Sequence, residues 1–160
     1  MSRDMHVRII KKDKETGKWN QVKIYRKEKG TKKFHIIQAS PFRDRELFDI
    51  LNENEDEKYH ANAICMSDLP IDLKREIEKC KNIKGYYGFK EINLADLKLY
   101  LHESPKIRNY DYEENDINAW KDNPVKNFIE RIEQYIDFAN PYWNIFQPIS
   151  DIKIIYWFDC

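Results

Sequence analysis

The strongest hydrophobic pattern lies at the end of the chain, in residues 152–158. Within this segment, Ile154 to Phe158 form an unbroken block of large aliphatic and aromatic side chains. The block is too short for a typical helix and is rich in β-branched and aromatic residues, as expected of a strand that is buried on both faces. The pattern therefore predicts that residues 152–158 form a central strand.

Three segments near the start of the chain also have the pattern of strands, at residues 6–12, 19–27 and 33–38. Gly17 and Gly30 lie in the connections between them, where tight turns need positive φ. Short connections between successive strands predict an antiparallel meander. We expect the strand at 152–158 to join this meander in the middle or beside its first strand.

Apolar residues at helical spacing predict a short helix at residues 43–52, a second that follows Pro70 and ends near Lys81, a third at 94–103 and a fourth at 124–139. The fourth has the clearest start, because Asn123 is a suitable N-cap and Pro124 suits the first helical position. Residues 85–92 are expected to be a short strand or an extended segment, and residues 104–122 a long polar connection. The predicted fold class is α+β, with an antiparallel sheet (an N-terminal three-stranded meander joined by the C-terminal strand) and three to four helices packed on it. A chain of 160 residues fits a single domain over 1–160.

The formal net charge is zero, with 28 basic and 28 acidic residues. This balance does not favour nucleic acid as a partner. The charge is nevertheless uneven, since residues 1–38 contain twelve Lys or Arg and four Asp or Glu. One interpretation is that lysines protect exposed strand edges from pairing, and the other is a patch that binds a polyanion.

Three scattered cysteines and the absence of an apolar run of 18 residues favour a cytosolic protein with reduced thiols and no membrane partner. No catalytic motif is recognisable, so we expect neither catalytic residues nor a cofactor. His60 and Cys65 are close in sequence, but a metal site would need further ligands, and the acidic residues at 111–116 lack the pattern of a calcium loop. No metal site is predicted.

Two short stretches and the end of the chain supply candidate ligand-binding residues. Arg43 and Arg45 lie where a strand gives way to a helix, where they could bind a phosphate or carboxylate or form a local ion-pair network. Tyr86 and Tyr87, next to Gly88, could provide rings for stacking on a base or could alternate across a strand. Trp157 and Asp159 end the last strand, and Asp159 could accept Arg43 or another cation.

Five motifs follow one another through most of the chain. They are the opening Met1-Ser2-Arg3-Asp4, the Thr16-Gly17-Lys18-Trp19 turn, the Arg43-Asp44-x-Glu46-Leu47-Phe48 helix, the Asp68-Leu69-Pro70 segment and the closing Tyr156-Trp157-Phe158-Asp159. In these motifs and their order the sequence resembles a group of small phage and prophage accessory proteins. The resemblance implies a phage protein in the cytoplasm of an infected host. Small proteins of this kind often act by binding a host defence protein or a signalling nucleotide.

These observations leave several functions open. The first expectation is a non-enzymatic binding protein that counters host antiviral defence by sequestering a nucleotide-type small molecule. The alternative is an inhibitor that binds a host defence protein or enzyme directly, with acidic residues 53–57 and 111–116 imitating a nucleic-acid backbone. A phosphoesterase-like enzyme and a structural or replication-associated phage protein are further alternatives, and a homo-oligomer is left open.

Overall fold

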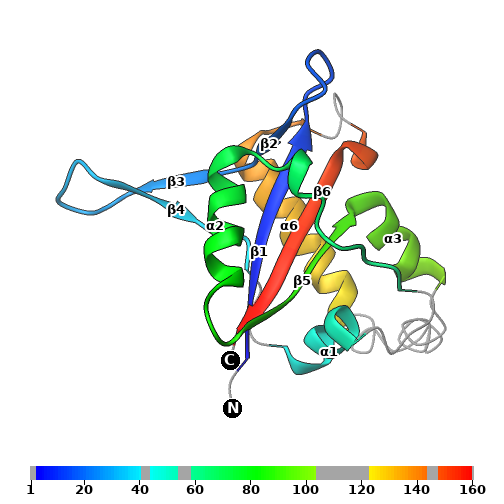
Figure 1. The fold of residues 1–160 in the computed structure, drawn as a ribbon. Coiled ribbons are helices and arrows are strands. Elements are labelled where there is room, and N and C mark those ends of the chain that lie inside the picture. Colours follow the sequence, from blue (N-terminus) through cyan, green and yellow to red (C-terminus); the bar gives the residue numbers. More distant parts are fainter. Residues whose placement is uncertain (1–2, 41–43, 54–58, 104–122, 144–147, 160) are drawn as a thin grey trace.

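The computed structural model describes residues 3–40, 44–53, 59–103, 123–143 and 148–159. Their central element is an antiparallel four-stranded sheet with the order β2-β1-β6-β5 (Figure 1). The strands are β1 (Asp4–Lys12), β2 (Trp19–Gln21), β5 (Tyr86–Asn93) and β6 (Ile152–Asp159). The α+β fold class predicted from the sequence is therefore confirmed.

Strand β6 is central, as its hydrophobic pattern predicts. It pairs with β1 along its whole length and with β5 on its other side, with an irregularity in the register between Tyr87 and Lys90. All five residues from Ile154 to Phe158 are buried. Alternate residues of a strand face opposite sides of the sheet, so this burial requires layers on both faces.

The helices supply these two layers (Figure 1). On one face, α1 (Arg45–Glu53), α3 (Leu94–Glu103) and α6 (Pro124–Ala139) share the larger hydrophobic core with Ile154, Tyr156 and Phe158 of the sheet. On the other face, α2 (Ile71–Lys81) packs Leu73 and Ile77 against Ile155 and Trp157. Short 3-10 turns at Met66–Asp68 and Ile149–Asp151 precede α2 and β6.

The helix starts follow the predicted chemistry. The Asn123 side chain accepts hydrogen bonds from the amides of Val125 and Lys126, each at 3.1 Å, and Pro124 begins α6. Asn93 caps α3 in the same way by accepting from Ala95 N at 2.8 Å. In the described part of the chain, no helix has the length and apolar character needed to cross a membrane.

The three-stranded N-terminal meander is the part of the prediction that the structure corrects. The segment 19–27 is divided between β2, which pairs with β1, and β3 (Ile24–Lys27), which pairs with β4 (Phe34–Ile37) in a separate two-stranded sheet. The chain departs from the main sheet after Val22, whose amide donates to Ile9 O at 2.8 Å. The next amide that could continue the strand, that of Ile24, instead donates to the hydroxyl of Tyr135 on α6. The third predicted strand therefore never reaches the main sheet, and β5 occupies the other side of β6.

Candidate functional sites

Three of the residues selected from the sequence meet at one end of the sheet, on the face that α2 covers. Asp159 is the register partner of Tyr86, and Trp157 lies two residues before it, on the same face. His6 of β1 is the register partner of Trp157. We call His6, Tyr86, Trp157 and Asp159 the strand-end cluster.

His6 holds the strand-end cluster together. Its Nε2 lies 2.5 Å from Asp159 Oδ2, and the two side chains are partly exposed. The imidazole stacks on Trp157, with ring centroids 5.5 Å apart and planes inclined by 17°, and it also lies against Tyr86 at 5.7 Å. Asp159 thus pairs with His6, whereas Arg43, the partner considered from the sequence, lies outside the described residues. The sequence analysis missed His6 because only the strand register brings the two residues together.

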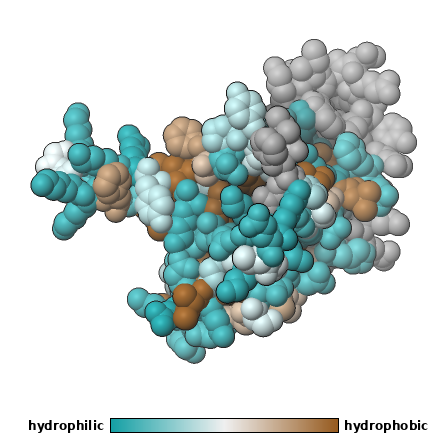
Figure 2. All heavy atoms as spheres, turned by 90° about the horizontal axis from the view of Figure 1, so that it is seen from above, coloured by the Kyte–Doolittle hydropathy of each residue, from teal (hydrophilic) through white to brown (hydrophobic). Residues whose placement is uncertain are grey.

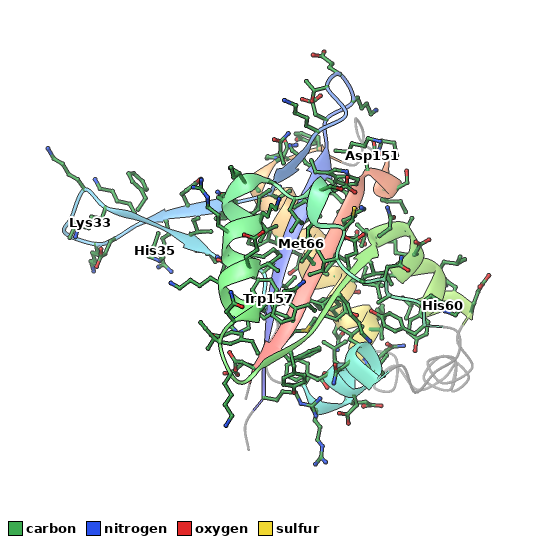
Figure 3. All side chains as sticks on the ribbon, in the orientation of Figure 1. Lys33, His35, His60, Met66, Asp151 and Trp157 are labelled. Atoms are coloured by element: carbon green, nitrogen blue, oxygen red, sulfur yellow. The ribbon has the colours of Figure 1, made fainter. Side chains whose placement is uncertain are left out.

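Trp157 is a core residue of the α2 layer, with 1% of its surface exposed. Phe89 stacks against it at 5.8 Å, and the guanidinium of Arg8 lies 5.0 Å from its ring centroid. Arg8 is itself buried and donates from Nε to Glu76 Oε1 on α2 at 2.7 Å. Figure 3 shows Trp157 at α2, within the body of the protein. Its ring faces are therefore covered by the protein's own side chains.

Tyr86 and Tyr87 lie on opposite faces of β5, so they do not form a common stacking platform. Tyr87 stacks on Phe158 at 5.8 Å and packs against the larger core. Gly88 has φ +68°, and a Cβ at this position would lie 2.6 Å from Asn52 Oδ1 and 2.9 Å from Phe158 Cδ2. The protein's own side chains, Asn52 and Phe158, thus make the close approach to the backbone that Gly88 permits.

The predicted anion site at the start of α1 is only partly within the described residues. Arg45 is the first residue of α1 and is exposed, whereas Arg43 lies outside the described part of the chain. The carboxylate of Asp44 accepts a hydrogen bond from Leu47 N at 3.0 Å. A negative side chain already occupies one of the amide donors at this helix start, which disfavours the binding of a further anion there.

Cys80 lacks the electrostatic surroundings of a nucleophilic cysteine. Burial raises the pKa of Cys80, and the nearby Glu76 carboxylate raises it further, whereas a nucleophilic cysteine needs a lowered pKa. Within the described ranges, no three His, Cys, Asp or Glu side chains are placed to hold a metal ion. The acidic stretch at 111–116 lies outside those ranges, as does most of 53–57.

A second candidate site was not selected from the sequence. Strands β3 and β4 and their turn form an arm, residues 24–37, that projects from the body of the protein (Figure 1). Every residue from 25 to 35 is exposed. Figure 2 shows the arm as a mostly hydrophilic projection, and Figure 3 shows Lys33 and His35 on it, to the left of α2.

The arm combines positive charge with exposed rings. Its basic residues are Arg26, Lys27, Lys29, Lys32 and Lys33, and its one acidic residue is Glu28. Tyr25 is 59% exposed and Phe34 is 64% exposed. The register pairs Tyr25 with Ile36 and Lys27 with Phe34, which places the two rings on one face of the arm as diagonal neighbours, about 7–8 Å apart.

The root of the arm is fixed to helices from both layers. The Tyr135 hydroxyl on α6 accepts from Ile24 N at 3.2 Å and donates to Ile37 O at 2.6 Å, so it contacts both strands where they leave the body. Lys23, one residue earlier, forms an ion pair with Asp72 on α2. The hydrogen bond from Lys23 lowers the pKa of Asp72, and the same bond raises the pKa of Lys23. These contacts hold the arm in a defined direction.

The class of protein that these features define is an α+β domain with a basic β-ribbon arm. Comparison with models of known families, with curated proteins and with solved structures finds no match to the chain. Its function must therefore be argued from its own residues.

Proposed function

We propose that the protein is a non-enzymatic binding protein whose arm captures a ligand with nucleotide chemistry, meaning phosphate charge combined with an accessible base. The observation that carries this proposal is the coexistence of five cationic side chains and two exposed rings on one projecting element. Lys and Arg pair with phosphates, and aromatic rings stack on bases of any sequence.

The distribution of charge supports the arm as the place where such a ligand binds. The chain has 28 basic and 28 acidic residues, of which the arm holds five and one, so the rest of the chain has 23 basic and 27 acidic residues. A body with excess negative charge repels a polyanion, while the arm attracts it. The field of the protein therefore directs an anionic ligand to the arm.

The biological setting of the proposal comes from the sequence resemblance. A phage accessory protein that sequesters a nucleotide ligand in the host cytoplasm would keep that ligand from a host antiviral defence system. The strand-end cluster has a structural role in this proposal. Trp157 is buried, so it belongs to the core of the domain from which the arm projects.

A protein partner is the second candidate function, and the exposed rings of Tyr25 and Phe34 favour it specifically. Aromatic residues are frequent anchors at protein interfaces, and the charge of the arm would select an acidic surface. Such a complex would form with a host defence protein and would not need a nucleotide.

The test is calorimetric titration of the full chain with a panel of mononucleotides, cyclic nucleotides and short oligonucleotides. The arm variant Arg26→Gln/Lys27→Gln/Lys32→Gln should lose the binding that the wild type shows. Its matched control removes three charges from the exposed surface of α2, in Lys74→Gln/Arg75→Gln/Lys79→Gln, and should bind as the wild type does. Equal loss in both variants would mean that net charge and not the arm is responsible, and the proposal would fail.

A further inference from the structure

The arm is one layer thick, which limits what it can hold. The hollow beside it has a volume of about 840 Å³, and among the described residues its lining comes from the arm's own residues 26–32 and 35. Sites for small molecules usually bury about 70–90% of the ligand between several walls. A two-stranded ribbon whose residues 25–35 are all exposed cannot enclose a mononucleotide in this way.

A longer ligand can instead make several weak contacts along the arm, all of which contribute to its binding free energy. Strand β3 extends about 10 Å from Ile24 to Lys27 at the rise of a β-strand, and the turn that follows it lengthens the arm further. Its cations are spread along this length, with Arg26 and Lys27 on β3 and Lys29, Lys32 and Lys33 around the turn. An extended polyanion that follows the face of Tyr25 and Phe34 would pass Lys27 and then the charges around the turn, whereas Arg26, the register partner of His35, lies on the opposite face.

The exposed rings distinguish a single strand from a duplex. Tyr25 and Phe34 share one face with Lys27, which is the register partner of Phe34 and lies two residues after Tyr25, so two rings and one cation point to the same side. Stacking on such rings needs bases that are not already paired and stacked in a helix. A duplex would offer the rings no unpaired base for stacking, and only the phosphate contacts would remain.

We propose that the ligand of the arm is a single strand of nucleic acid several nucleotides long. This inference rests on the proposed function and narrows the class of ligand. A free nucleotide and a strand offer the same phosphate and base groups, but the strand can make more contacts with the arm. It also revises the expectation drawn from the zero net charge, since the charges that matter are gathered on one projecting element.

The test is fluorescence anisotropy of the full chain with labelled oligothymidylates of about 4, 8 and 16 nucleotides, the range of known single-strand sites. A duplex of matched length and unlabelled thymidine monophosphate as a competitor complete the set. We expect affinity to rise with strand length, and the mononucleotide to compete at least about 100-fold more weakly than the longest strand, because it can occupy only one stacking position. Binding should weaken with salt, with a log–log slope of about −0.7 for each phosphate contacted.

Ring variants test the stacking contribution. Tyr25→Ala and Phe34→Ala should each weaken binding to the single strand about 5- to 100-fold, whereas Tyr25→Phe should retain it because the ring remains. Phe138→Ala is the matched control, because Phe138 is 75% exposed on α6 and lies outside the arm. All three positions are exposed rings, so the four variants should keep the fold, and circular dichroism checks this.

The outcomes separate the two proposals. If the mononucleotide competes as well as the longest strand, the inference of a strand is overturned and the proposed function stands. If the duplex binds as tightly as the single strand and the ring variants change nothing, the inference is also overturned, because backbone charge alone would explain binding. If no nucleotide of any length binds, both the inference and the proposed function fail.

Discussion

Substitution of Gly88 by alanine tests how the sheet is closed around β6. Gly88 lies at the irregularity between β5 and β6, with φ +68°. Glycine adopts this conformation without cost, whereas a residue with a Cβ pays about 1–2 kcal/mol. Alanine would also place its Cβ 2.6 Å from Asn52 Oδ1 and 2.9 Å from Phe158 Cδ2.

The two contacts differ in how readily they are relieved. Asn52 Oδ1 is the end of a side chain that can rotate away. Phe158 is fully buried between Phe48, Tyr87 and Tyr156, so its ring can move only by disturbing the larger core. Overpacking of this kind costs about 1–3 kcal/mol. The total expected loss in the free energy of unfolding for Gly88→Ala is therefore about 2–5 kcal/mol, a large part of the stability of an ordinary domain.

The assay is urea unfolding followed by tryptophan fluorescence, with Gly30→Ala as the matched control. Gly30 has φ +80°, but a Cβ there would have nothing within 4 Å, so this variant measures the conformational cost alone. Gly88→Ala should be the less stable variant by about 1–3 kcal/mol. If the two variants unfold at the same urea concentration, Gly88 is not packed against Phe158 and the reasoning fails.

Two further predictions concern polar groups that join distant parts of the fold. Tyr156→Phe should reduce the free energy of unfolding by about 1–3 kcal/mol, measured by urea titration. The reason is that the buried Tyr156 hydroxyl lies 2.5 Å from the Tyr59 hydroxyl and donates to Leu51 O at 2.9 Å. An unchanged midpoint of unfolding would contradict this prediction. The hydrogen bond from Lys153 at 3.1 Å lowers the pKa of Asp68, so the stabilisation is present above the unfolded pKa of about 3.9 and is lost as pH falls through the folded pKa. Asp68→Asn should therefore be less stable than the wild type near neutral pH by at most about 1 kcal/mol, since the pair is partly exposed. In thermal unfolding the difference should begin to shrink as pH falls below about 3.9 and should disappear once pH is below the lowered folded pKa of Asp68. A difference that stays constant in strong acid would refute the ion pair.

Local signals in the sequence were sufficient for most of the fold. The start of α6 follows from Asn123 and Pro124, whose capping chemistry acts within three residues. The central position of β6 follows from its unbroken apolar block, because only a strand covered on both faces can bury every residue. These features depend on neighbours in sequence, so a single sequence is enough to predict them.

The features that were missed depend on partners far along the chain. His6 and Asp159 are 153 residues apart, and only the register of β1 against β6 brings them together. The division of the second predicted strand depends on Tyr135, which is 111 residues from Ile24, and on Asp72, which is 49 residues from Lys23. No periodicity within residues 19–27 indicates these contacts, so the arm was not predicted and its residues were not selected as a site.

The arm also shows how the two interpretations of the N-terminal basic excess relate to each other. An isolated two-stranded ribbon has open edges, and lysines on it prevent pairing with other chains, so the protective interpretation accounts for the charge. It does not account for Tyr25 and Phe34, because exposed rings beside an open edge promote the association that the lysines oppose. A ribbon that only had to avoid aggregation would be expected to carry polar side chains at both positions. The combination of rings and cations is instead what a single-strand binding surface needs, and the exposure of both rings therefore favours a binding arm over a merely protected one.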